Sequence, residues 1–170
     1  MLRIEKVTEK DAALITELSR STFYDTYHEY NTAEDMQQFL DTYFYEENIR
    51  NELARPTNDC FVVYDDHIPA GYVNLRESEN PTALNGLNVL ELARIYVVKD
   101  KIGTGAGKLL MEKSIELAKQ KNKAAIWLCV WQKNPRAIQF YERWGFEIFT
   151  TAKFILGKDV QDDFLMKKML

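Results

Sequence analysis

Hydrophobic positions along the chain change their spacing several times, and each spacing predicts a different kind of element. Apolar residues at every second position, or in a short continuous run, predict strands at 2–7, 60–64, 68–75, 87–98, 124–131, 146–156 and 163–170. Apolar residues three or four positions apart predict a helix after the capping pair Thr8 and Asp11, a helical, aromatic region over 21–54, and helices over 108–121 and 134–144. The order of these segments predicts a mixed α+β (α/β) fold around a central sheet.

Length and composition predict a single domain that covers residues 1–170. Of the 170 residues, 46% are hydrophobic and 28% are charged, which supplies one sizeable core, and no repeat or linker marks a second domain. No apolar run approaches the roughly 18 residues that cross a bilayer. The charged start, Met1–Lys6, is unlike a signal peptide. We therefore expect a cytoplasmic protein without a membrane partner.

Charge is distributed unevenly along the chain. Residues 1–60 contain thirteen acidic and six basic residues, and the segment from Ser21 to Ile49 contains seven acidic residues and no Lys or Arg. Because the whole chain has a formal net charge of −4, the remainder is mildly basic, and a nucleic-acid partner is not expected. This division suits an anionic ligand and a cationic substrate, although an ordinary solvated acidic surface gives the same counts.

Cysteine and histidine residues give no sign of a metal site. Cys60 and Cys129 both lie in apolar, strand-like segments, so we expect buried, reduced thiols rather than a disulfide or a catalytic thiol. His28 and His67 are far apart and lack the spacing of metal ligands. We therefore expect no bound metal.

A glycine-rich segment, Lys101-Ile102-Gly103-Thr104-Gly105-Ala106-Gly107-Lys108, joins a predicted strand to a predicted helix. Its three glycines allow a tight turn in which several backbone N–H groups point to one place. The start of the helix adds a positive partial charge there. The loop is therefore a candidate anion site, and alone it indicates a phosphate or pyrophosphate group.

A second motif follows about thirty residues later: Asn134-Pro135-Arg136-Ala137-Ile138-Gln139-Phe140-Tyr141-Glu142-Arg143-Trp144-Gly145-Phe146. Together the two motifs resemble those of the GCN5-related N-acetyltransferase (GNAT) superfamily, over about residues 60–156. The resemblance implies a mostly antiparallel, twisted sheet of about seven strands, splayed between strands 4 and 5 and flanked by helices. It also implies acetyl-CoA as co-substrate, with no metal. One position departs from the family pattern, because Ile102 stands where the family has Arg or Gln, and Lys101 or Lys108 could supply that charge.

The resemblance also implies roles for individual residues. The strand backbone at Ile95, Tyr96 and Val97 would pair with the pantetheine arm, and the Ile95 N–H would polarise the thioester carbonyl. The backbone from Gly103 through Thr104, Gly105, Ala106 and Gly107 to Lys108 would hold the pyrophosphate, while Asn134 would contact the pantetheine or the diphosphate. Tyr141 would protonate the departing thiolate, and a buried helix aromatic is the alternative for this residue.

Glu91 is the candidate general base, because it occupies the position of the base in the histone-acetylating branch of the superfamily. An alkylamine is mostly protonated at neutral pH, so the reaction needs a group that removes a proton. Simple strand alternation predicts Glu91, Ala93 and Ile95 on one face. A pair between Glu91 and Arg94, or a place on a solvent-facing edge, is the alternative.

The segments Glu91-x-x-Arg94-Ile95-Tyr96 and Ile126–Asn134 are especially similar to those of bacterial spermidine/spermine N-acetyltransferases of the Pai type. This resemblance implies a polyamine acceptor. Tyr24, Asp25, Tyr27 and Glu29 are candidate contacts, since ammonium groups bind carboxylates and aromatic faces. Packing between helices is the alternative for the tyrosines. Two alternatives remain open: the acceptor is a protein N-terminus or a lysine, or the protein is a non-catalytic acyl-CoA sensor. The sequence does not fix the oligomeric state, and a homodimer is possible.

Overall fold

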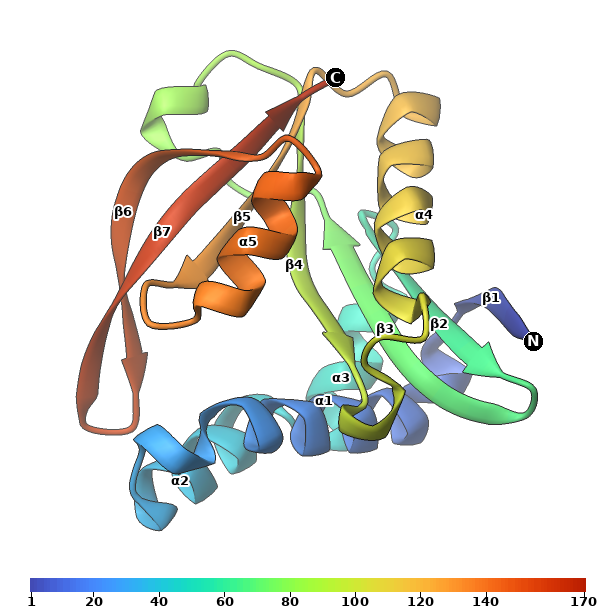
Figure 1. Ribbon diagram of the computed structural model, residues 1–170, viewed down its shortest axis with the longest axis vertical. Helices are drawn as coiled ribbons and strands as arrows, with labels where there is room; N and C mark the ends of the chain where they lie inside the picture. The colour runs from blue at the N-terminus through green and yellow to red at the C-terminus, as the bar shows by residue number, and fades with distance from the viewer.

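The centre of the molecule is a sheet of seven strands in the order β1-β2-β3-β4-β5-β7-β6 (Figure 1). The computed structural model describes residues 1–170. The strands are β1 (Leu2–Val7), β2 (Asn58–Asp65), β3 (Ile68–Arg76), β4 (Val89–Val97), β5 (Ala125–Trp131), β6 (Glu147–Leu156) and β7 (Asp159–Met169). The α-helices are α1 (Ala12–Tyr27), α2 (Ala33–Tyr43), α3 (Glu46–Ala54), α4 (Ala106–Gln120) and α5 (Pro135–Arg143). Short 3-10 helices are η1 (Glu9–Asp11), η2 (His28–Tyr30), η3 (Thr82–Leu84) and η4 (Lys99–Lys101).

The predicted mixed fold is confirmed, and most elements begin and end near their predicted positions. Two starts differ: α4 begins at Ala106, and β7 begins at Asp159. The early start of β7 follows from a tight turn after β6. Gly157 adopts φ 62°, which favours glycine. Leu156 therefore pairs directly with Asp159, and the ladder between β6 and β7 begins at once.

The sheet opens between β4 and β5, as expected for the fourth and fifth strands. These two strands are the parallel neighbours, and they pair only at Val89 with Ala125, Leu90 with Ile126, and Glu91 with Trp127. The other neighbouring strands are antiparallel. Beyond the paired residues β4 and β5 diverge, which divides the sheet into a half with β1–β4 and a half with β5–β7–β6 (Figure 1).

Helices cover both faces of the sheet. Residues of α4 and α5 form one core with the strands, and residues of α1, α2 and α3 form a second core on the other face. Alternation along β2 supplies both, since Phe61 and Val63 belong to the first core and Cys60 and Val62 to the second. Full burial of one such apolar side chain stabilises the fold by about 1.5–3 kcal/mol. None of the helices combines the length and apolar composition that crossing a membrane requires.

The two cysteines lie in different surroundings. Cys60 is buried in the core under α1–α3, as predicted. Cys129 is exposed, so the prediction of a buried thiol is wrong for this residue. The reason is the opening of the sheet: Cys129 lies on β5 beyond Trp127, the last residue of β5 that pairs with β4.

A bulge in β4 lies next to the opening. Leu92 pairs with Leu75 and Arg94 pairs with Asn74, so Ala93 is an extra residue without a partner on β3. Such a bulge bends a strand and reverses the direction of the side chains that follow it.

The prediction that Glu91, Ala93 and Ile95 share one face is therefore wrong. Leu90 and Leu92 belong to the core under α4, which leaves Glu91 on the opposite face. After the bulge, Ile95 packs against the α4 core. Glu91 and Ile95 thus lie on opposite faces of β4.

Candidate active site

The backbone of β4 presents unpaired groups to the opening. The Val98 N–H donates to the Ala70 carbonyl at 2.8 Å, so it points toward β3. Because the direction alternates along an antiparallel strand, the N–H groups of Ile95 and Val97 point the other way, toward β5. No residue of β5 pairs with this part of β4. A ligand with amide groups can therefore bind here as an additional strand.

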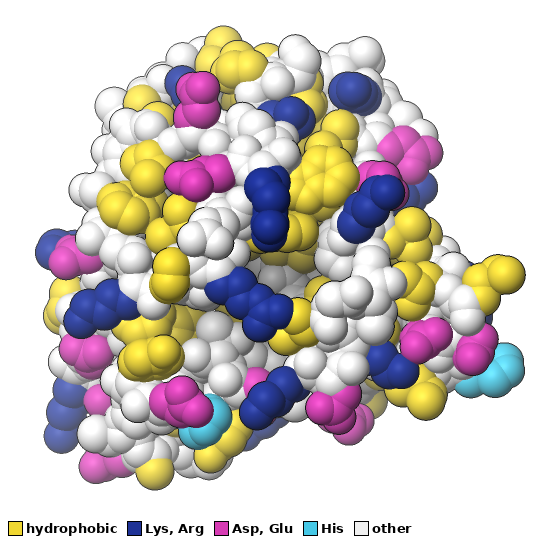
Figure 2. Space-filling view, in the orientation of Figure 1, with side chains coloured by type: hydrophobic (Ala, Val, Ile, Leu, Met, Phe, Trp, Pro, Cys, Tyr) yellow, Lys and Arg dark blue, Asp and Glu magenta, His cyan; other side chains and the backbone are white.

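The glycine-rich loop stands at the end of this opening. Gly103 and Gly105 have φ 88° and 96°, which only glycine adopts without strain. Five N–H groups in the loop and the first turn of α4 donate to no protein acceptor; they belong to Gly103, Gly105, Ala106, Gly107 and Lys108. In the view of Figure 2, Lys and Arg side chains surround the hollow at the centre of the molecule. The arrangement suits an anion.

Two lysines flank the loop, and only one is free to move. The Lys101 Nζ lies 2.8 Å from Asp65, which holds this side chain on the β2–β3 hairpin. The Lys108 side chain is 70% exposed, and its Nζ is 3.8 Å from Glu112. Ile102, at the family's Arg or Gln position, is itself 42% exposed. Lys108 is thus the lysine with freedom to reach a ligand.

Helix α5 carries Asn134 and Tyr141 to the other side of the opening. The Asn134 Oδ1 caps the helix by accepting from the Ala137 N–H at 3.2 Å, and this leaves the Asn134 amide N–H groups free. Tyr141 is 7% exposed, and its ring packs against Phe140 and Phe146. Its hydroxyl has no protein hydrogen-bond partner and is not among the fully enclosed polar atoms. The Tyr141 hydroxyl is therefore accessible from outside the core, while burial of the residue raises its pKa well above the usual value.

Three phenols from different elements meet at this point. Burial raises the pKa of Tyr27 on α1 to about 12, and it also raises the pKa of Tyr96 on β4. Tyr27 and Tyr96 lie close enough to affect each other's pKa, and Tyr141 lies close enough to raise the pKa of Tyr96 and to have its own pKa raised by Tyr27. All three are therefore neutral hydroxyls that can donate or accept hydrogen bonds.

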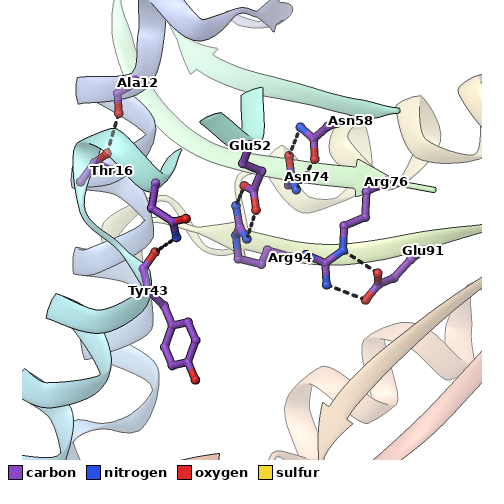
Figure 3. Close-up of polar contacts among 10 residues, drawn as sticks. Ala12, Thr16, Tyr43, Glu52, Asn58, Asn74, Arg76, Glu91 and Arg94 are labelled. Atoms are coloured by element: carbon purple, nitrogen blue, oxygen red, sulfur yellow. Dashed lines mark hydrogen bonds and ion pairs between the residues drawn. The ribbon is translucent and has the colours of Figure 1, made fainter. Parts of the chain in front are cut away.

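The expected general base, Glu91, is already paired. Its two carboxylate oxygens accept from the Arg76 Nε at 2.6 Å and the Arg76 Nη2 at 3.1 Å (Figure 3). Arg94 is not the partner of Glu91, because it pairs with Glu52 on α3 beside it (Figure 3). Glu91 therefore lies at the last paired position of β4 before the opening, as one half of a bidentate ion pair.

The four candidate acceptor contacts on α1 and η2 do not lie together. Tyr24 and Asp25 line a surface hollow of about 580 Å³ on the outer side of α1, between α1 and the start of α3. Glu29 is exposed on η2. Tyr27 points inward, and its ring centroid lies 5.6 Å from that of Trp131 on β5. Of the four, Tyr27 is the residue that the structure brings to the opening.

Sequence reasoning missed Asp163 on β7, which is 8% exposed and lies near Tyr27 and Cys129. The alternation of residues along the strand could have indicated its burial. Gln161, Asp163 and Leu165 are alternate residues of one strand, and all three are buried on one face. A carboxylate between inward-facing neighbours indicates a special role.

This arrangement, an open sheet with a loop of free N–H groups beside it, defines a class of acyl-transfer proteins. The model of the Acetyltransferase (GNAT) family matches residues 15–146. The chain is 36% identical over 169 residues to an uncharacterised N-acetyltransferase of Lactobacillus delbrueckii subsp. lactis, covering 99% of this chain and 98% of that protein. The chain therefore belongs to the Acetyltransferase (GNAT) family.

Solved structures show the same fold. The PaiA N-acetyltransferase of Thermoplasma acidophilum, in complex with coenzyme A, aligns with a TM-score of 0.81 at 21% identity, over 100% of this chain and 99% of that one. The ribosomal-protein-S18-alanine N-acetyltransferase of Escherichia coli aligns with a TM-score of 0.73 at 18% identity, over 98% and 92%. At these identities the likeness concerns the fold.

Proposed function

We propose that this protein transfers the acetyl group of acetyl-CoA to a primary amine of a small molecule, with both substrates bound together. The observation that carries the proposal is the opening between β4 and β5, with free N–H groups at its end and the Tyr141 hydroxyl at its side. The family supports the reaction class. The coenzyme A bound by the Thermoplasma protein of the same fold supports the donor.

The residues around the opening fit a long anionic thioester. In this proposal the backbone over Gly103–Lys108 binds the pyrophosphate, and Lys108 adds the charge that Ile102 lacks. The N–H groups of Ile95 and Val97 bind the pantetheine amides, and the Asn134 amide contacts the same arm. The free N–H groups of the loop support this assignment, since unpartnered donors at a helix start stabilise bound phosphate.

Two groups then act on the reacting atoms. The Ile95 N–H donates to the thioester carbonyl oxygen and stabilises the negative charge that grows there, an effect worth several kcal/mol for well-placed donors. Tyr141 donates its proton to the sulfur as the bond to carbon breaks. The raised pKa of Tyr141 supports this role, because the phenol keeps its proton until a strong base, the departing thiolate, lies beside it.

The acceptor that we propose is a polyamine such as spermidine or spermine. The resemblance to Pai-type enzymes supports it, as does the acidic character of residues 21–49. Glu91 is the base proposed by resemblance. Both of its carboxylate oxygens accept hydrogen bonds from Arg76, so the base role competes with that ion pair.

Thiol release from acetyl-CoA, measured with spermidine, spermine, lysine, an aminoglycoside and a peptide N-terminus, tests this function. We expect turnover with a small amine and a loss of about 100-fold or more in Tyr141→Phe, in line with general acid catalysis. Coenzyme A affinity should change little. Tyr43→Phe is the matched control, since Tyr43 is exposed on α2. Equal turnover in Tyr141→Phe contradicts the acid role. Turnover with the peptide alone favours a protein acceptor, and coenzyme A binding without any turnover favours a sensor.

A further inference from the structure

Asp163 is a buried carboxylate at the acceptor side of the opening. It lies on β7 directly opposite Trp131 of β5 and Ala152 of β6, so these three side chains share one face of the sheet. Only 8% of Asp163 is exposed. Its Oδ1 atom is enclosed and accepts no hydrogen bond.

No cation pairs with Asp163, which sets it apart from other buried carboxylates of the protein. Glu91 pairs with Arg76, and Asp59 pairs with Lys6 and Lys121. An uncompensated buried charge destabilises a fold. Asp163 therefore carries a destabilising charge that no interaction within the protein offsets.

Aromatic rings surround the position. Trp131 contacts Tyr27 at 5.6 Å and Tyr30 at 5.0 Å between ring centroids. Asp163 lies directly opposite Trp131 on the neighbouring strand, which places the carboxylate beside this ring cluster. A carboxylate next to aromatic faces binds an alkylammonium group, through an ion pair and through cation–π contact.

There is also room beside this cluster for the rest of an acceptor. A hollow of about 240 Å³ begins at Trp131 and Tyr30 and continues along the start of β7, with Asp159, Asp162 and one cation, Lys133, in its wall. Asp162 forms an ion pair with Lys153, and the Asp159 carboxylate accepts a hydrogen bond from the Gln161 side-chain amide. An aliphatic chain that extends from the ammonium group fits this hollow.

We infer that Asp163, with Tyr27 and Trp131, forms the subsite for the protonated primary amine of the acceptor, and that its carboxylate takes the proton that this amine must lose. This inference rests on the proposed function and gives its substrate class: an alkylamine that is cationic at neutral pH. It places the proton acceptor on β7 rather than at Glu91 on β4.

The attacking nitrogen loses two protons. The ammonium group gives one proton to Asp163, which passes it to water, and the neutral nitrogen attacks the acetyl carbon. The bond from nitrogen to carbon forms while the bond from carbon to sulfur breaks. Tyr141 gives its proton to the thiolate, and the second proton that leaves the nitrogen restores the Tyr141 hydroxyl.

The surroundings of Asp163 set the pH range in which it can act. Burial, and secondarily the charge of Asp162, raise its pKa to about 6. The other ionisable groups facing it are Tyr27 on α1 and Cys129 on β5, whose pKa values are both raised to about 12 and which are neutral in this range. Asp163 should therefore accept a proton above about pH 6 and not below.

Amine acetylation by wild type, Asp163→Asn, Asp162→Asn and Glu91→Gln tests the inference, with butylamine and spermidine as acceptors and thiol release as the readout. We expect kcat/KM to fall about 100-fold or more in Asp163→Asn. In the wild type kcat/KM should fall tenfold per pH unit below about pH 6, and Asp163→Asn should lack this acidic limb. Asp162→Asn, which removes the neighbouring exposed charge, and Glu91→Gln should both keep the limb.

Binding gives a second measurement that needs no variant. Calorimetric titration of the wild-type coenzyme A complex with the better acceptor should show binding about tenfold weaker at pH 5 than at pH 8, because a carboxyl with a pKa of about 6 is then mostly protonated. Unchanged activity in Asp163→Asn, loss of the limb in Glu91→Gln, or pH-independent binding overturns the inference while the proposed function stands. No thiol release by the wild type with any amine overturns both.

Discussion

Replacing Asp163 with Asn should change how the stability of the protein depends on pH. Burial raises the pKa of the Asp163 carboxyl from 3.8 to about 6. A carboxyl whose pKa is higher in the folded state stabilises the fold below its unfolded pKa, and this contribution is lost as the pH rises through the folded pKa. For Asp163 the loss therefore occurs between about pH 4 and pH 7. Asn has nearly the same shape and does not titrate, so it removes this dependence.

The size of the effect follows from these two pKa values. At pH 5 the unfolded carboxyl is ionised, whereas the folded carboxyl is about one unit below its pKa and holds its proton. One pKa unit corresponds to about 1.4 kcal/mol. At pH 8 both states are ionised and the contribution is gone. Between pH 5 and pH 8 the wild type should therefore lose about 1.4 kcal/mol of unfolding free energy relative to Asp163→Asn.

Urea unfolding at pH 5 and pH 8 measures this difference, because all other titrating groups are common to both proteins and their contributions cancel. Asp162→Asn is the matched control: it removes a negative charge from the same strand, but the Asp162 side chain is exposed and paired with Lys153. A difference between wild type and Asp163→Asn that is the same at both pH values, or that has the opposite sign, would refute the reasoning. If Asp162→Asn changed the pH dependence of the unfolding free energy by the same amount, the effect would come from the net charge of the protein.

Two further predictions concern the cofactor loop and the support of β4. Gly105→Ala should lower stability by about 1–2 kcal/mol and weaken coenzyme A binding, since Gly105 has φ 96° and an alanine there strains the cradle; calorimetry and thermal melting measure both, and unchanged affinity contradicts the loop assignment. Glu52→Gln should destabilise the fold by about 3–5 kcal/mol, because it leaves the Arg94 guanidinium buried and unpaired. Urea unfolding measures this loss against Glu47→Gln, whose exposed pair with Arg50 contributes about 1 kcal/mol or less.

Local sequence signals were sufficient for most of the fold and for the backbone conformation of the glycine-rich loop. The capping box at Thr8 and Asp11 is present, and Gly145 ends the last helical segment with φ 86°. Gly103 and Gly105 adopt the backbone conformations that only glycine favours. In each case the signal and the structure it specifies lie within a few residues, so one sequence is enough to predict them.

The surroundings of Glu91 and the faces of β4 depend on partners far apart in the chain, and here strand alternation alone does not predict them. The bulge at Ala93 reverses the faces of β4, and no residue type marks an extra residue of this kind. Arg76, not Arg94, is the partner of Glu91, because β3 and β4 place these two residues opposite each other. Their pairing is a property of strand register, which sequence spacing does not reveal.

The ion pairs near the opening use the available arginines, so the Asp163 carboxylate is left without a cation partner. Arg94 offsets Glu52, and Arg76 offsets Glu91, so both acidic groups enter the fold with their own cations. Asp163 has none, and the nearby phenols are neutral. In our proposal, a cation that enters beside Asp163 meets the one buried carboxylate that has no cation partner, and its binding relieves the destabilisation that Asp163 imposes on the free protein. In this proposal the same charge that lowers stability selects a cationic amine.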